Sequence, residues 1–145
     1  MSCIEVHSLS KSYSSILAVD TIDLSVESGQ VFGFLGPNGA GKSTVIKLLT
    51  TLIQPDSGQI SVLGVNAIEE PLKIRKKIGV VLQQPSYEPT LSVEKSLEKY
   101  GMMWNVDKKT RQIRTEELLE SFELTQIRKK KNEDLSIGQR RRVQV

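Results

Sequence analysis

Short apolar segments separated by polar turns fill the first half of this chain, and longer amphipathic segments fill the second half. Residues 3–7 and 18–26 alternate between apolar and polar side chains, which predicts two half-exposed β-strands. Residues 31–35 and 78–82 are continuous apolar runs, and their length is typical of buried strands. This order of segments indicates a mixed α/β fold.

Helices are predicted where apolar residues recur three or four positions apart. Ser92, followed by Glu94 in the first turn, suits a helix N-terminus. Residues 59–63 predict a further strand that ends at Gly64, and the polar residues 8–15 predict a loop. The predicted helices cover residues 45–52, 69–77, 91–104 and 107–122.

Between the first continuous apolar run and the first predicted helix, residues 36–44 read Gly-Pro-Asn-Gly-Ala-Gly-Lys-Ser-Thr. They fit G-x-x-x-x-G-K-[ST], and strand, glycine-rich loop and helix follow in the order of a phosphate-binding P-loop. Glycines let the backbone approach phosphates, and consecutive N–H groups with the helix N-terminus attract an anion. The predicted nucleotide-binding residues are Gly36, Pro37, Asn38, Gly39, Ala40, Gly41, Lys42, Ser43 and Thr44.

Two side chains carry the chemistry of this motif. Lys42 can reach the β- and γ-phosphates, so it is a predicted catalytic residue, and the Ser43 hydroxyl can ligate Mg²⁺. The alternative is a glycine-rich turn before an unrelated helix. That alternative requires the spacing, the Lys-Ser pair and both flanking segments to agree by coincidence.

Composition narrows the class of protein. With 145 residues, 38% apolar and 26% charged, the chain has the profile of one soluble domain. No apolar run approaches the roughly 18 residues that span a bilayer, and the N-terminus lacks the pattern of a secretory signal. The lone Cys3 fits a reducing cytoplasm. Residues 73–145 hold most of the basic side chains, which is typical either of a site for nucleic acid or anionic lipid or of a solvated helical surface, and we favour the solvated surface.

Residues 135–143, Leu-Ser-Ile-Gly-Gln-Arg-Arg-Arg-Val, form the second informative stretch. With the P-loop, this stretch resembles the ATP-binding cassette (ABC) ATPases, in which an L-S-G-G-Q signature accompanies a P-loop of the form G-P-N-G-A-G-K-S-T. Here Ile137 replaces the first signature glycine. The motifs are most similar to those of export cassettes of the daunorubicin-resistance type, and the resemblance covers the whole chain.

The resemblance implies further site residues. The matching aromatic residue stacks on adenine, a glutamine contacts Mg²⁺ and the attacking water, and the signature closes on the γ-phosphate held by an opposite subunit. Gln84 is an adjacent alternative to the glutamine, and we expect Ile137 to be tolerated because Gly138 makes the nearer contact. Tyr13 is implied as the residue that stacks on adenine, and Gln83 as the catalytic and metal-binding glutamine. The implied signature residues are Ser136, Gly138 and Gln139.

The fold implied by the resemblance is a P-loop NTPase core with an antiparallel β subdomain and a helical subdomain, lacking the C-terminal strands of the sheet. Residues 1–145 then form the N-terminal part of one ABC ATP-binding domain, and residues 86–140 form the helical subdomain with the signature. Residues 31–35 and 78–82 are the expected parallel strands.

The implied function is that of an ATP-binding subunit of an ABC transporter, which couples the binding and hydrolysis of ATP to transport across a membrane. ATP and Mg²⁺ are the implied cofactors. The implied partners are a transmembrane permease subunit and a second ATP-binding subunit, in a homo- or heterodimer. The implied location is cytoplasmic, peripheral at the inner face of the cell membrane.

Two alternatives to this function have to be weighed. The family's catalytic Asp and Glu and its switch His follow the signature and have no counterpart in this sequence, so the resemblance implies an ATPase without deciding whether these residues hydrolyse ATP. The chain is alternatively a truncated, catalytically inactive fragment that at most binds nucleotide. Relatives that act on nucleic acid or ribosomes carry tandem cassettes or a coiled-coil insertion, which this sequence lacks, so no nucleic acid is expected.

Overall fold

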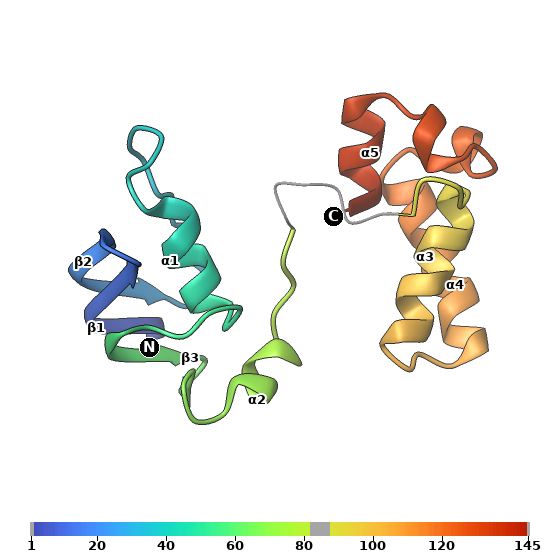
Figure 1. Ribbon diagram of the computed structural model, residues 1–145. Helices are drawn as coiled ribbons and strands as arrows, with labels where there is room; N and C mark the ends of the chain where they lie inside the picture. The colour runs from blue at the N-terminus through green and yellow to red at the C-terminus, as the bar shows by residue number, and fades with distance from the viewer. Residues whose placement is uncertain (1, 82–87, 145) are drawn as a thin grey trace. The chain divides into compact units, whose positions relative to one another are not determined.

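The computed structural model of this chain describes residues 2–81 and 88–144 (Figure 1). Its contacts divide the chain into two compact units, residues 1–80 and residues 81–145. The first unit combines an antiparallel sheet with two helices, and the second unit is helical. Each unit has its own cluster of buried apolar side chains.

A four-stranded antiparallel sheet with the order β2-β1-β3-β4 organises the first unit. Val6 in the central strand pairs with Leu24 of β2 on one side and Ile60 of β3 on the other. The three strands predicted in this region are confirmed, and a short fourth strand follows the turn at Gly64, where φ is +72°. The strands are β1 (Ser2–Tyr13), β2 (Ile16–Glu27), β3 (Ser57–Val62) and β4 (Val65–Asn66).

The loop predicted for residues 8–15 is wrong as far as Tyr13, because β1 continues to that residue, and only Ser14 and Ser15 form a turn. The polar side chains in this stretch are half-buried or exposed, and they lie along a strand whose backbone is paired with β2. Register shifts between Val6 and Leu9, with φ of +48° at Ser8, let the long hairpin bend without ending. The sequence showed the polarity of the segment and gave no sign of its pairing partner.

Helix α1 (Lys42–Leu49) packs its apolar face on this sheet. Val45 and Leu48 are buried beside Leu9 and Ile60, and Ile74 of the short helix α2 (Pro71–Arg75) closes the same core. Burial of each such side chain stabilises the unit by about 1.5–3 kcal/mol before the entropy of ordering is counted. The helix therefore has a fixed position against the sheet, and the loop that precedes it is anchored at its end.

The two predicted parallel strands are not formed in the described residues, which corrects the sequence analysis. Residues 31–35 and 78–81 have no strand pairing, and the side chains of Val31 and Leu35 are 99% and 97% exposed. A strand exists only when a neighbouring strand satisfies its N–H and C=O groups, and no described strand lies beside either run. Residue 82, the end of the second run, lies outside the described residues.

The second unit is built on an antiparallel pair of helices, α3 (Val93–Met103) and α4 (Lys108–Ser121). Both predicted helices are confirmed, and their caps explain where they begin: the Ser92 hydroxyl accepts the Lys95 N–H at 3.4 Å. Asp107 caps α4 in the same way, accepting the Thr110 N–H at 3.0 Å. The chain then passes through η1 (Thr125–Ile127) and η2 (Asn132–Asp134) into α5 (Ile137–Gln144).

None of the described helices has the length and apolar character needed to cross a bilayer.

Candidate nucleotide-binding site

The glycine-rich loop at residues 36–41 turns directly into α1, which begins at Lys42. Three of its glycines have positive φ, +151° at Gly36, +86° at Gly39 and +81° at Gly41, a region that side chains rarely adopt. Gly41 is also short of space, because an ideal Cβ there would lie 2.3 Å from the Ala18 carbonyl oxygen. The loop geometry therefore requires glycine at these positions, as the motif predicts.

The Lys42 side chain folds back across the loop. Its ammonium group donates hydrogen bonds to the carbonyl oxygens of Gly36, at 2.7 Å, and Pro37, at 2.6 Å. The positive charge is thus held inside the curve of the loop by two neutral acceptors. Phosphate oxygens carry full negative charge and are stronger partners for an ammonium group than carbonyls are.

The residues present fit a phosphate group and a hard cation. The backbone N–H groups of Gly39, Gly41 and Ser43 make no hydrogen bond to other described residues, and they lie at the positive end of α1. No group of three or more His, Cys, Asp or Glu side chains in the described part of the chain could hold a metal ion. A Mg²⁺ ion at the exposed Ser43 hydroxyl would therefore take its other ligands from phosphate oxygens, water and the predicted ligand Gln83.

Tyr13 ends β1 and pairs with Ile16 across the tip of the hairpin. Tyr13 is 44% exposed, which leaves part of the residue accessible to a base. Two residues beyond Ile16, the Ala18 carbonyl contacts Gly41 of the phosphate loop. The structure thus brings the hairpin that carries Tyr13 up to the loop, while the adenine role of Tyr13 stays a prediction.

Gln83 and its neighbour Gln84 lie outside the described residues. Their predicted contact with Mg²⁺ and water stays a prediction.

The signature residues form a reciprocal cap at the start of α5. The Gln139 N–H donates to the Ser136 hydroxyl oxygen at 3.2 Å, and the Ser136 N–H donates to the Gln139 side-chain oxygen at 3.0 Å. This is a capping box, and its Ser-x-x-Gln spacing was readable in the sequence although the sequence analysis did not use it. Ile137 is 84% exposed and buries almost nothing, and Gly138 has open space around its Cβ position.

The segment that leads into the signature is hydrogen-bonded to the start of the helical unit. The Asn132 N–H donates to the Leu91 carbonyl at 2.9 Å, and the Glu133 N–H donates to the Pro89 carbonyl at 3.1 Å. The buried Asn132 side chain adds hydrogen bonds to the Glu88 carbonyl at 2.8 Å and the Ser96 hydroxyl at 2.7 Å. Sequence reasoning missed Asn132, which lies in a charged stretch that gave no sign of burial.

Arg128 ties the same region together by ion pairs. Its guanidinium group donates to both carboxylate oxygens of Glu94, at 2.6 and 3.2 Å, and to both of Glu116, at 2.6 and 2.9 Å. These bonds raise the pKa of Arg128 and lower that of Glu94. The basic run at 128–131 is therefore partly a structural joint between α3 and α4.

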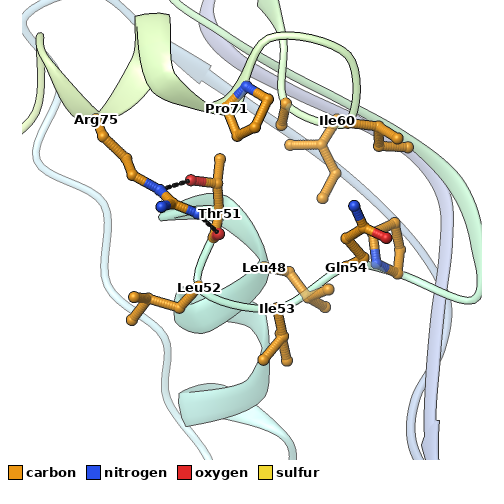
Figure 2. Close-up of a pocket in the computed structure, with 11 residues that line it drawn as sticks. Leu48, Thr51, Leu52, Ile53, Gln54, Ile60, Pro71 and Arg75 are labelled. Atoms are coloured by element: carbon orange, nitrogen blue, oxygen red, sulfur yellow. Dashed lines mark hydrogen bonds between the residues drawn. The ribbon is translucent and has the colours of Figure 1, made fainter.

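A cavity of about 180 Å³ lies at the C-terminal end of α1, away from the loop (Figure 2). Apolar side chains including Leu48, Ile53 and Ile60 line it, and Arg75 closes one side through hydrogen bonds to the Thr51 hydroxyl at 2.8 Å and the Thr51 carbonyl at 2.6 Å. Because the P-loop is at the other end of the helix, this cavity is not part of the nucleotide site.

Comparison with known proteins identifies relatives across the whole chain. The family described as "ABC transporter" matches residues 19–145. The doxorubicin resistance ATP-binding protein DrrA of Mycobacterium tuberculosis is 37% identical over 97% of this chain and 43% of its own length. The linearmycin resistance ATP-binding protein LnrL of Bacillus subtilis is 37% identical over 98% of this chain and 46% of its own length. The chain thus spans less than half the length of these curated relatives.

Solved structures agree with the sequence comparison. The ATP-binding cassette MJ0796, described as a dimer in a post-hydrolysis state bound to ADP and Pi, matches with a TM-score of 0.85 and 27% identity, over 97% of this chain and 66% of that one. The cbiO1 protein from Clostridium perfringens, described as part of the complex cbiONQ, matches with a TM-score of 0.86 and 26% identity, over 98% of this chain and 59% of that one. The predicted P-loop NTPase fold class is therefore confirmed, and the chain belongs to the ABC transporter family.

Proposed function

We propose that this chain is the nucleotide-binding part of an ABC transporter subunit, which binds ATP with Mg²⁺ and couples its hydrolysis to transport across a membrane. The observation that carries the proposal is the phosphate loop: glycines with positive φ, free N–H groups, and the Lys42 ammonium held within 2.6–2.7 Å of two loop carbonyls. ATP supplies a phosphoanhydride bond whose cleavage releases the energy for the transport cycle.

The residues of this chain divide the work of holding the nucleotide. Lys42 exchanges its two carbonyl partners for the β- and γ-phosphate oxygens, and the Ser43 hydroxyl ligates the ion. Tyr13 offers its exposed ring to the adenine. Gln83 orients the attacking water. Three signature residues contact the γ-phosphate bound by a second subunit: Ser136, Gly138 and Gln139.

The partners follow from the same proposal. A second ATP-binding subunit completes each site, and a transmembrane permease subunit anchors the pair at the cytoplasmic face of the membrane. The description of MJ0796 as a dimer and of cbiO1 as part of a complex supports such an assembly. The drug-resistance names of several relatives favour an exporter.

The proposal is tested by binding of a fluorescent ATP analogue to the wild-type chain, to Lys42→Ala and to Lys47→Ala. Lys47 lies on the same helix with an exposed side chain and is the matched control. Loss of the charged hydrogen bonds of Lys42 should weaken binding by about 10-fold or more, whereas Lys47→Ala should bind like wild type. Equal binding by all three chains would contradict the proposed site.

Phosphate release separates the proposed ATPase from the non-enzymatic alternative. A chain that binds the analogue in a Lys42-dependent way and releases phosphate from ATP is an ATPase. Lys42-dependent binding without phosphate release would instead support a nucleotide-binding fragment without catalysis.

A further inference from the structure

The last two residues of α3 and the first residue of its connection to α4 are large, apolar and exposed. Met102 is 59% exposed, Met103 is 66% exposed and Trp104 is 63% exposed. Scattered apolar residues on a surface are ordinary, but neighbouring ones at a loop tip form a patch that a partner can cover. Figure 1 shows this connection at one end of the helical unit, with α5 and the short helices before it at the other.

The tip is held in a fixed shape. The Val106 N–H donates to the Gly101 carbonyl at 2.9 Å, and the Arg111 guanidinium donates to the Val106 carbonyl at 2.7 Å. Gly101 lies so close to the Arg111 side chain that an added Cβ would stand 2.6 Å from its Cγ. The apolar side chains are therefore displayed by a braced turn, with little ordering left to occur on binding.

Basic residues flank this patch in the sequence. Residues 99–114 hold five basic residues and one acidic residue, Asp107, whose carboxylate caps α4. Lys108 and Lys109 follow that cap directly, and neither forms an ion pair with a described residue. Cations in the first turn of a helix oppose its dipole, so these two lysines are not placed there for helix stability.

We infer that the α3–α4 tip, with Met102, Met103 and Trp104 flanked by Lys108 and Lys109, docks directly on an anionic membrane surface. The apolar side chains enter the boundary between headgroups and acyl chains, where tryptophan is favoured, and the ammonium groups pair with lipid phosphates. This contact is separate from the nucleotide site and needs no permease. The basic run at 128–131 lies at the other end of the unit and takes no part.

Trp104 makes the inference directly measurable, because it is the only tryptophan in the 145 residues. The wild-type chain is mixed with vesicles of phosphatidylcholine alone or of phosphatidylcholine with phosphatidylglycerol. We expect the Trp104 emission to shift to the blue, and its quenching by iodide to fall, with the anionic vesicles only. High salt should reverse both changes, because it screens exposed charges.

Two double variants test the residues. Lys108→Glu with Lys109→Glu should weaken binding to anionic vesicles by roughly 30-fold or more, since each basic side chain near the surface contributes a factor of about five. Acidic residues suit the start of a helix, so these changes should leave α4 intact, which far-UV circular dichroism checks. Lys76→Glu with Lys77→Glu, exposed lysines of the other unit, should bind like wild type.

The double variant Met102→Ser with Met103→Ser tests the apolar part of the surface. It should reduce the blue shift of the Trp104 emission and weaken binding to anionic vesicles. The inference is overturned if the wild-type emission is the same with both kinds of vesicle, or if the two lysine double variants lose equal affinity. It is also overturned if single-stranded RNA shifts the Trp104 emission and anionic vesicles do not.

Discussion

Gly41 lies against the backbone of Ala18 so closely that a Cβ atom at position 41 would stand 2.3 Å from the Ala18 carbonyl oxygen. The contact joins β2 to the phosphate loop, and it fixes the place where α1 begins. Gly39 has a similar φ, +86° against +81°, but apart from its chain neighbours no described residue comes within 4 Å of its Cβ position. Substituting alanine at Gly39 therefore tests backbone strain alone, whereas substituting alanine at Gly41 tests backbone strain together with a steric clash.

We predict that Gly39→Ala lowers the free energy of unfolding by about 1–2 kcal/mol, from the left-handed backbone alone. Gly41→Ala should cost at least about 1 kcal/mol more, because the backbone of β2 must move. Chemical denaturation followed by far-UV circular dichroism measures both. If the two variants lost the same unfolding free energy, the phosphate loop would have shifted to accommodate the new Cβ atom without moving β2.

The capping box at the signature predicts that two substitutions of Ser136 differ. Ser136→Ala should lower the free energy of unfolding by about 1 kcal/mol, because an N-cap is lost, whereas Ser136→Asp keeps a good cap and should be near wild type. In a complete cassette Ser136→Asp should nevertheless abolish ATP-dependent dimerisation, because its carboxylate repels the γ-phosphate. Dimerisation by the aspartate variant at wild-type levels would remove Ser136 from the proposed phosphate contact.

Ile137 replaces the first signature glycine and is 84% exposed. Ile137→Gly should therefore cost no packing and less than about 1 kcal/mol in unfolding free energy, the difference in helix propensity. We predict that ATP-dependent dimerisation of a complete cassette, measured by size-exclusion chromatography, stays close to wild type. A large gain in dimerisation would mean that the isoleucine impairs closure.

Asn132 is 1% exposed, and its side-chain oxygen has no hydrogen-bond partner among the described residues. Asn132→Asp should lower the free energy of unfolding by about 3 kcal/mol or more at neutral pH, because it buries an uncompensated charge. Burial should raise the pKa of the new carboxyl group, so stability should recover as the pH falls and the group is protonated. Urea unfolding followed by Trp104 fluorescence measures this, and a loss that is independent of pH would contradict the explanation.

Because Glu94 forms an ion pair with Arg128, we predict that this pair makes the free energy of unfolding depend on pH in the acid range. Arg128 holds the pKa of Glu94 below its ordinary value of 4.5. The unfolded chain then binds the proton more readily, so the contribution is complete above pH 4.5 and is lost as the pH falls through the lower pKa of the folded state. Glu94→Gln should be less stable than wild type at neutral pH, and the difference should shrink on acidification.

The matched control for that experiment is Glu117→Gln. Glu117 forms an exposed pair with Arg114 on a single helix, and such pairs contribute little. If Glu117→Gln showed the same pH dependence of unfolding free energy as Glu94→Gln, the effect would come from removing any negative charge and not from the ion pair with Arg128.

Interactions between residues close in the sequence were enough to predict much of the secondary structure of the helical unit. Ser92 and Asp107 each cap the helix that follows, because a short polar side chain can reach an N–H group three residues on. The spacing of Lys42 and the preceding glycines also required a loop that turns into a helix. In these places the physical interaction spans a few residues, so the sequence contains both partners side by side.

Partners far apart in the sequence could not be read in the same way. Gly41 meets Ala18, Asn132 meets Ser96, and Arg128 joins Glu94 to Glu116 only because the fold brings them together. The apolar run at 31–35 shows this limit most clearly, since its residues have strand character but no strand lies beside them in the described part of the chain.

The sequence by itself determined the family motifs, the approximate starts of α3 and α4 and the residue types that a phosphate loop needs, because spacing and backbone preference act locally. Only the tertiary structure decided how far β1 extends, that Lys42 is held by loop carbonyls, and that Trp104 is displayed at a braced tip. These features depend on which surfaces meet. The hydrophobicity of a side chain predicts that it favours burial, but the tertiary structure determines whether other residues pack against it.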